Sequence, residues 1–268
     1  MIEVYSVSYT VAELKAVPKA DRTFFLAMTG LANDLQTLTK QFRISMNFSD
    51  ESKIVQQGAH SVAMLNLRML AGRMYEGWKS ISGHYPKLAD VYDQRLGEQA
   101  KQARLELNRY FKPSLETSKP KPPASLLEMV RHKIGFHSDW TLISKNFDVF
   151  EDDAEMGEYF CETMGNTLYF SAELIHLQTL STLQGKPVDP IVALDRLISD
   201  AIAVTGWINH FAFGFAHAFL SLHFEHKLQA MPQNFDLIMG QPEFDDLRLP
   251  FFVEGFRNSE SKRAPEAP

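Results

Sequence analysis

Cysteine is almost absent from this sequence, and neither sign of charge dominates it. Cys161 is the single cysteine among 268 residues, which excludes an intrachain disulfide and a metal cluster built on several thiolates. It lies in an apolar helical pattern, so we expect its thiol to be buried as a small hydrophobe. The formal net charge is −6, so the composition does not indicate tight, sequence-independent binding of nucleic acid. A local basic patch would still allow an RNA substrate.

The sequence also lacks the signs of a disordered or an exported chain. Hydrophobic residues make up 45% of it and charged residues 22%, which is ordinary for a soluble protein with a packed core. Its length suits one large helical domain or two packed lobes. The first residues, Met1 to Tyr5, show no basic region followed by an apolar run, so no secretory signal is indicated. We therefore expect a cytoplasmic protein.

Convincing strand patterns are few, whereas apolar residues recur every three or four positions along most of the chain. This spacing predicts an all-α fold, an irregular helical bundle. Thr10 followed by Glu13 is a capping-box pattern at the start of the first helix. The one strand candidate is Ile2 to Tyr9. The predicted helices cover about 11–17, 21–47, 52–83, 88–112, 124–137, 154–183 and 189–228.

Four prolines between residues 113 and 123 mark the best internal boundary. Proline-rich segments of this kind are extended linkers. We expect residues 1–257 to form a single helical domain that contains this linker. Residues 258–268 are charged and rich in Pro and Ala, so we expect a disordered tail. The stretch 229–257 reads as mixed coil with several Phe residues, which would suit contact with a protein partner.

One long stretch contains no charged side chain: no Asp, Glu, Lys or Arg lies between Asp200 and Glu225. A stretch of this length could cross a bilayer. Asn209 and three histidines within it would, however, be costly in hydrocarbon. A helix that is apolar all round also fits the centre of a large bundle. We favour the core helix, and membrane association is the less favoured alternative.

The histidines of the sequence do not form a clear metal site. His223 and His226 could chelate one ion together, and Glu173 with His176 matches the Glu-x-x-His motif of di-iron bundles. Those bundles repeat the motif on a second helix, and this sequence does not. We therefore expect neither a metal site nor a cofactor, and we expect core histidines whose hydrogen bonds are satisfied.

One short segment, Arg131 to Asp139, carries a pattern with a chemical meaning. Five residues separate Arg131 from His137, and this spacing resembles the signature of HEPN-family proteins, an arginine followed after four to six residues by a histidine. The resemblance covers this segment alone. It implies a metal-independent endoribonuclease of a defence or toxin type, in which both protomers of a homodimer contribute these side chains. The family often has Asn directly after the arginine, where this sequence has His132.

The chemistry of these residue types is consistent with such an activity. A histidine can take a proton from a ribose 2′-hydroxyl or give one to the leaving oxygen. An arginine can hold the phosphate through two bonds as charge builds. On an unbroken helix Arg131 and His137 would point about 120° apart, and Gly135 is a place where the helix could loosen. His132 and Asp139 would support the pair, Asp139 by orienting the histidine ring.

A structural interpretation of the same residues remains open. His137 continues an apolar helix face that includes Val130 and Ile134, so it could be a core-edge residue near a helix C-terminus. Arg131 would then be solvated or ion-paired, for example with Glu128. The sequence thus leaves two main hypotheses. One is an endoribonuclease that uses Arg131 and His137, and the other is a non-catalytic helical module that binds a protein partner through the Phe-rich C-terminal part.

Overall fold

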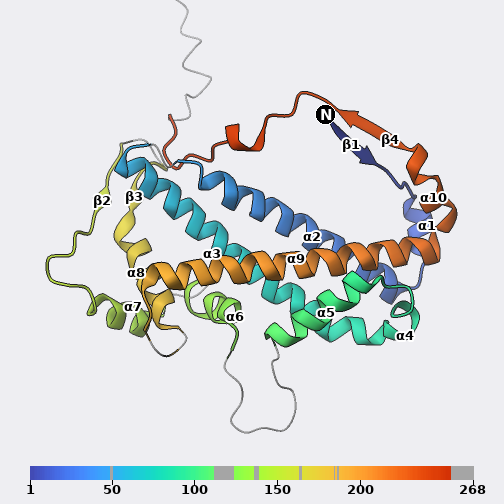
Figure 1. The fold of residues 1–268 in the computed structure, drawn as a ribbon, viewed down its shortest axis with the longest axis horizontal. Helices are drawn as coiled ribbons and strands as arrows, with labels where there is room; N and C mark the ends of the chain where they lie inside the picture. The colour runs from blue at the N-terminus through green and yellow to red at the C-terminus, as the bar shows by residue number, and fades with distance from the viewer. Residues whose placement is uncertain are drawn as a thin grey trace, which may run out of the picture.

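A computed structural model describes most of the chain. The predicted linker at 113–123 and the predicted tail at 258–268 lie outside the described residues, and so does His137. Within the described ranges the chain is mostly helical with little strand, which confirms the all-α fold class (Figure 1). The described residues are 1–48, 51–111, 124–135, 139–162, 165–183, 185 and 187–254.

Three long helices form the frame of the described chain, and shorter helices pack around them. The long ones are α2, α3 and α9. Each agrees within a few residues with a helix that the apolar spacing predicts. The bounds are α1 (Val11–Ala16), α2 (Lys19–Ser45), α3 (Lys53–His84), α4 (Ala89–Tyr92), α5 (Glu98–Phe111), α6 (Leu126–Val130), α7 (Trp140–Phe147), α8 (Phe170–Thr182), α9 (Pro190–His223) and α10 (Glu225–Ala230).

Two small antiparallel ribbons and some short turns complete the described chain. β1 pairs with β4, and β2 pairs with β3. The first ribbon confirms a strand near the N-terminus, although a shorter one than the sequence predicts. The bounds are β1 (Ile2–Tyr5), β2 (Glu158–Tyr159), β3 (Leu168–Tyr169), β4 (Phe235–Ile238), the 3-10 turns η1 (Tyr85–Lys87), η3 (Met231–Gln233) and η4 (Phe244–Asp246), and the π-helical turn η2 (Arg131–Gly135).

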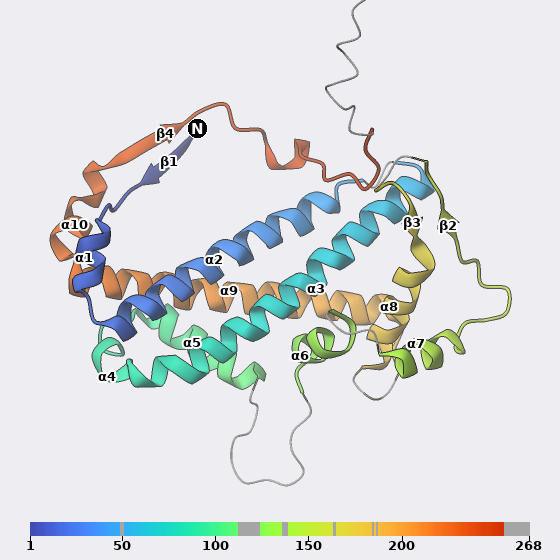
Figure 2. The same ribbon diagram turned by 180° about the vertical axis from the view of Figure 1, so that it is seen from behind.

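Helix α9 runs along the whole body of the protein, as both ribbon views show (Figure 1, Figure 2). Helices α2 and α3 form a hairpin that packs against it. Helices α4 and α5 lie towards the end where α9 finishes, whereas α6, α7 and α8 gather at the end where α9 begins. The β1–β4 ribbon stands on the opposite side of α2 from α5 and α6.

Aromatic side chains on α9 form the centre of the core. Phe211, Phe215 and Phe219 are four residues apart, so they lie on one face of α9, where all three are fully buried. Phe24 of α2 meets Phe215 edge to face with centroids 4.8 Å apart, and Phe25 stacks on Phe219 at 4.1 Å. These contacts confirm the core interpretation of the uncharged stretch. No helix in the described ranges combines the length and the apolarity needed to cross a membrane.

Side-chain caps fix the starts of α1 and α9. The Thr10 hydroxyl accepts from the Glu13 amide at 3.2 Å, and the Glu13 carboxylate accepts from the Thr10 amide at 2.7 Å. This is the capping box that the sequence predicts. Asp189 accepts from two backbone amides at the start of α9, at 2.8 and 3.3 Å, and Pro190 takes the first helical position.

The helix predicted over 88–112 is broken into α4 and α5, so that prediction was wrong in its middle. The break is the turn 93–97. The carboxylate of Asp93 accepts from the Tyr85 hydroxyl at 2.6 Å and from the Arg104 guanidinium at 3.0 Å. Asp93 therefore ties the turn to η1 before it and to α5 after it, through contacts that the apolar spacing does not contain.

The helix predicted over 154–183 begins only at Phe170, as α8. The segment before it contains the β2–β3 ribbon, and Gly165 there has a φ of 87°, in the left-handed region that interrupts a helix. The side chain of Asn166 exchanges two hydrogen bonds with the backbone of Val253, at 2.5 and 2.9 Å. A contact so distant in the sequence could not be read from local periodicity.

Two further expectations fail in the same region. Cys161 is exposed in the connection between β2 and β3, so the expectation of a buried thiol was wrong. Helix α7 was not predicted, although Asp139 gives it a side-chain N-cap that accepts from the Leu142 amide at 3.2 Å. Its first residue, Trp140, is 82% exposed, and Asn146 is the one buried residue of α7, so this short helix adds little to the core.

The close contact between α5 and α9 gives a test of the packing. A methyl group at Gly214 would overlap Cβ of Ala100, whereas one at Gly206 on the same helix meets nothing within 4 Å. We predict that Gly214→Ala lowers the free energy of unfolding by about 1–3 kcal/mol through overpacking. Gly206→Ala should raise it by about 0.5–1 kcal/mol through helix propensity. Urea unfolding measures both, and equal effects of the two changes would contradict the packing.

Candidate functional site

The segment that resembles the HEPN signature begins on the π-helical turn η2, directly after α6. Ser125 caps α6 by accepting from a backbone amide at 3.3 Å, and the helix widens from Arg131 to Gly135. Turns of this kind are rare and often lie at functional sites. At Gly135, the residue where we expect the helix to loosen, the chain lies beside the backbone of Arg68 on α3. His137 follows two residues later, outside the described residues.

The guanidinium of Arg131 is held against α3. Its Nη2 forms an ion pair with Oε1 of Glu76 at 2.7 Å, and its Nη1 donates to the Nδ1 of His132 at 3.0 Å. The guanidinium also lies over the ring of Tyr75, 5.4 Å from its centroid. The ion-pair partner is therefore Glu76 and not Glu128. With 26% of its side chain exposed, Arg131 borders the solvent.

Tyr75 is the ring around which these groups gather. Its hydroxyl donates to Glu128 at 3.2 Å, and the ring of His132 meets it edge to face at 5.5 Å. Burial and then the Glu128 carboxylate raise the pKa of Tyr75 above its ordinary value of 10.0. The phenol is therefore neutral in ordinary buffers. Its π face attracts two cations, the guanidinium of Arg131 and the ammonium of Lys79.

Asp139 already has two local partners. One carboxylate oxygen accepts from Nζ of Lys133 at 3.1 Å, and the other accepts from the Leu142 amide as the cap of α7. The hydrogen bond from Lys133 and, after it, the one from the Leu142 amide hold the pKa of Asp139 below its usual value. Because His137 lies outside the described residues, support of His137 by Asp139 stays a prediction.

A buried ion pair on α3, beside η2, was not predicted from the sequence. Nη1 and Nη2 of Arg68 contact the two carboxylate oxygens of Glu173 on α8 at 2.9 and 3.3 Å, and Nη1 also donates to Nδ1 of His176 at 2.6 Å. The side chains of Arg68 and Glu173 are only 10% and 13% exposed. The Glu-x-x-His pair of the sequence, Glu173 with His176, therefore contacts an arginine. The one sign of this ion pair in the sequence is that Arg68 lies among the apolar residues of α3.

The Arg68–Glu173 pair is ionised at neutral pH. Burial raises the pKa of Glu173, but its contacts with His176 and with the Arg68 guanidinium together outweigh burial and bring that pKa below its ordinary value of 4.5. The carboxylate therefore neutralises the buried guanidinium. Burial also lowers the pKa of the neighbouring His60 ring. No group of three or more His, Cys, Asp or Glu side chains placed to hold a metal ion occurs within the described ranges.

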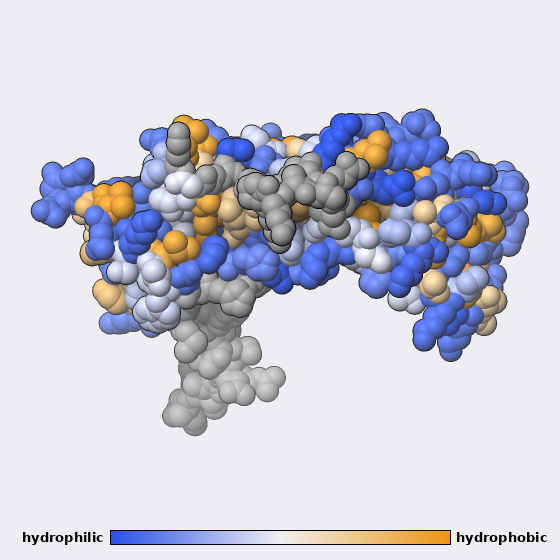
Figure 3. Space-filling model, turned by 90° about the horizontal axis from the view of Figure 1, so that it is seen from below, coloured by the Kyte–Doolittle hydropathy of each residue, from blue (hydrophilic) through white to orange (hydrophobic). Residues whose placement is uncertain are grey.

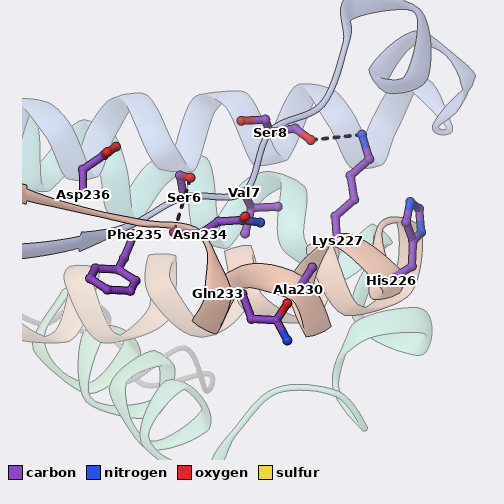
Figure 4. Close-up of a pocket in the computed structure, with 10 residues that line it drawn as sticks. All are labelled: Ser6, Val7, Ser8, His226, Lys227, Ala230, Gln233, Asn234, Phe235 and Asp236. Atoms are coloured by element: carbon purple, nitrogen blue, oxygen red, sulfur yellow. Dashed lines mark hydrogen bonds between the residues drawn. The ribbon is translucent and has the colours of Figure 1, made fainter.

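A surface cleft of about 640 Å³ lies far from η2, between the N-terminal segment and the α10–β4 connection (Figure 4). Lys227 reaches across it to the carbonyl of Ser8 at 3.0 Å and also pairs with Glu13 at 2.8 Å. The one imidazole among its lining residues, His226, lies at the far end from Phe235 in this view. The amine of Lys227 is thus used to hold the N-terminal segment, and none of the predicted site residues lines this cleft.

No protein-family model, curated protein or solved structure matches this chain. The relationship to HEPN-type ribonucleases therefore stays a prediction that rests on the segment from Arg131 to Asp139.

The Arg68–Glu173 pair gives a pH-dependent prediction. Removing one partner of a buried pair leaves an uncompensated charge, so Glu173→Gln should lower the free energy of unfolding by about 3 kcal/mol at pH 7. Folding lowers the pKa of Glu173 below its ordinary value of 4.5. The ionised carboxylate therefore stabilises the fold fully above about pH 4.5, and this stabilisation is lost as the pH falls through the lowered pKa of the folded state. Urea unfolding from pH 7 to 3 should show the gap between wild type and variant closing.

The matched control is Glu98→Gln. Glu98 pairs with Lys101 on α5, but its side chain is 90% exposed, so the change should be small at every pH. A gap between wild type and Glu173→Gln that stays constant down to pH 3 would show that the charge of Glu173 is not what stabilises this part of the fold.

Proposed function

We propose that this protein is a metal-independent endoribonuclease in which Arg131 holds the scissile phosphate and His137 is the general acid or base. The observation that carries the proposal is the π turn η2. The segment that resembles the HEPN signature begins on the one π turn in the described chain, and such turns favour functional sites. His132 and Lys133, both exposed, add further basic side chains to this turn.

The proposed chemistry uses the ribose itself as nucleophile. His137 removes the proton from the 2′-hydroxyl, and the 2′-oxygen attacks the adjacent phosphorus. The bond from phosphorus to the 5′-oxygen breaks, and that oxygen takes a proton, from a second His137 or from water. The products are a 2′,3′-cyclic phosphate and a 5′-hydroxyl. Arg131 stabilises the negative charge that builds on the phosphate oxygens during attack.

A substrate phosphate would have to displace Glu76 from its ion pair with Arg131. A phosphate presents two oxygens in the geometry that a guanidinium prefers, so it would replace the Glu76 carboxylate at Arg131. The Glu76 side chain is 41% exposed, and a carboxylate that can turn to water gives up such a pair at small cost. Tyr75 would keep the guanidinium in place during the exchange.

Cleavage of single-stranded RNA in EDTA tests the proposal. We predict that Arg131→Ala and His137→Ala each lower kcat/KM by about 100-fold or more, because one removes charge stabilisation and the other proton transfer. Lys145→Ala, which removes an exposed lysine of α7 outside this turn, should change it less than threefold. Glu76→Gln, which removes the competing charge but keeps the shape, should lower KM.

The melting temperature of each variant separates catalysis from folding. Cleavage by the wild type that resists chelation, with both catalytic variants inert and folded, supports the proposal. Full activity in Arg131→Ala, or an inert wild type whose His137→Ala variant melts several degrees lower, contradicts it. The second outcome would assign His137 to the core.

A second candidate function is a protein-interaction module, and the β1–β4 ribbon favours it. All eight residues of the ribbon are exposed. An isolated two-stranded ribbon is only marginally stable in water, and its outer edges present free backbone groups that can pair with another strand. The exposed apolar side chains are Ile2, Val4, Tyr5, Phe235, Leu237 and Ile238.

The position of the ribbon adds to this support. The lower face of the protein, seen in Figure 3, is largely hydrophilic, with hydrophobic residues in small separate groups. The ribbon lies on the opposite side in Figure 1 and combines apolar side chains with unpaired strand edges. Exposed apolar patches of this kind often mark contact surfaces.

Sedimentation velocity over a range of concentrations tests this candidate, with a second copy as the simplest partner. We predict that Leu237→Lys removes association and leaves the melting temperature unchanged, because Leu237 is 50% exposed. Phe213→Lys is the matched control, since Phe213 is 76% exposed but belongs to α9 and not to the ribbon. A wild type that stays monomeric throughout, or a Leu237→Lys variant that still associates, counts against the candidate.

A further inference from the structure

A second cleft, of about 540 Å³, lies between the first turns of α2 and the end of α3. Ala20, Phe24, Ala27 and Leu88 are among the residues that line it, and they give it largely apolar walls. A concave, mostly apolar site of this volume is typical of small-molecule binding. The walls favour a ligand with a hydrocarbon part, because removal of apolar surface from water drives its binding.

Three basic side chains also line this cleft, and none of the described residues that line it is acidic. The basic residues are Lys19 at the start of α2, His84 at the end of α3 and Lys87 in η1. All three are exposed, so a ligand in the cleft can reach their side chains. None of these side chains forms an ion pair or a hydrogen bond with another residue that the structure describes. Cations beside apolar walls, with no carboxylate among them, attract an anion.

Contacts between α2 and α3 fix how the two sides of the cleft are aligned. Phe24 of α2 meets Tyr85 of η1 with ring centroids 5.9 Å apart. Leu31, two turns further along α2, packs against Gly77 of α3, where a Cβ atom would overlap the leucine side chain. The two helices therefore run antiparallel along the cleft. The start of α2 lies beside η1, and its next two turns lie beside the last turns of α3.

This alignment gathers the basic groups at one end of the cleft. Lys19 lies at the level of Lys87 and near His84, whereas Ala27 and Ser80 form the other, uncharged end. The rise along α2 from Lys19 to Ala27 is about 12 Å, which suits a hydrocarbon chain of medium length. The end of α3 and the start of α2 lie together here, so their opposite dipole charges offset one another and the side chains set the local charge.

We propose that this cleft binds a medium-chain fatty carboxylate. The carboxylate accepts hydrogen bonds from the ammonium groups of Lys19 and Lys87, and the alkyl chain lies along α2 towards Ala27. An uncharged hydrocarbon would leave both ammonium groups without a counter-charge, and inorganic phosphate would leave the apolar walls exposed to water. No residue of α6 or η2 lines this cleft, so the proposal does not depend on the ribonuclease activity.

Octanoate and 1-octanol test the proposal, because they share a chain length and differ in the charge of the head. Calorimetric titration or ligand-observed NMR, below the concentration at which octanoate forms micelles, gives the Kd of each. We expect octanoate to bind the wild type at least 10-fold more tightly than 1-octanol. The double variant Lys19→Gln/Lys87→Gln should weaken octanoate about 10-fold and leave 1-octanol unchanged, because it removes two charged donors and keeps the walls. Lys40→Gln is the matched control, since Lys40 is an exposed lysine of α2 outside the lining.

A bulky side chain at the uncharged end provides the second arm of the test. Ala27→Phe should fill that end and weaken both probes at least 10-fold, whereas Leu26→Phe should bind them as the wild type does. Leu26 is the neighbouring residue on α2, 52% exposed and outside the lining.

Three results with octanoate overturn the proposal: no binding to the wild type, binding no tighter than that of 1-octanol, or equal binding to the double lysine variant. Unchanged binding of both probes to Ala27→Phe also overturns it. Binding to phosphatidylglycerol vesicles without binding of free octanoate does so too, and would assign the cleft to a membrane surface. The lysine arm decides the question even if Ala27→Phe fails to fold.

Discussion

Helix α9 can lie at the centre of the bundle because residues 201–224 contain no Asp, Glu, Lys or Arg. Its row of phenylalanines packs against α2, and its small residue Gly214 lets α5 approach closely. Asp200 is the charged residue directly before this stretch. Its carboxylate accepts from the hydroxyl of Tyr110 on α5 at 2.7 Å, so the charge has a hydrogen-bond partner on a helix that packs against α9. The placement of α2 and α3 follows from this central packing.

Helix α3 in turn positions everything near the candidate site. Two turns of it carry Arg68, which binds Glu173 of α8, and Glu76, which binds Arg131 of η2. Between them Tyr75 lies under the Arg131 guanidinium and bonds α6. Arg131 is therefore held on α3 by two kinds of contact, the ion pair with Glu76 and the cation–π contact with Tyr75, and it also donates to His132 of its own turn. Such support is what the proposed phosphate-binding role of Arg131 requires.

The sequence predicts those parts of the fold that depend on local patterns. The long periodic helices, the capping box at Thr10 and the core role of α9 follow from spacing and from the absence of charge. The breaks in the other helices depend on contacts that spacing does not contain, such as the bonds of Asp93 to Tyr85 and Arg104. For the same reason sequence indicates Arg131 as a candidate and Gly135 as a loosening point, but it does not identify Glu76.

We propose that Arg131 and His137 cleave RNA by attack of the ribose 2′-oxygen on phosphorus, without a metal ion. Mass spectrometry of the product ends tests it most directly, with a short RNA digested in EDTA. The account predicts 2′,3′-cyclic phosphate and 5′-hydroxyl ends, and an RNA with 2′-deoxy substitutions at the cleaved positions should stay intact. Ends with 3′-hydroxyl and 5′-phosphate, or cleavage of the deoxy-substituted RNA, would contradict it.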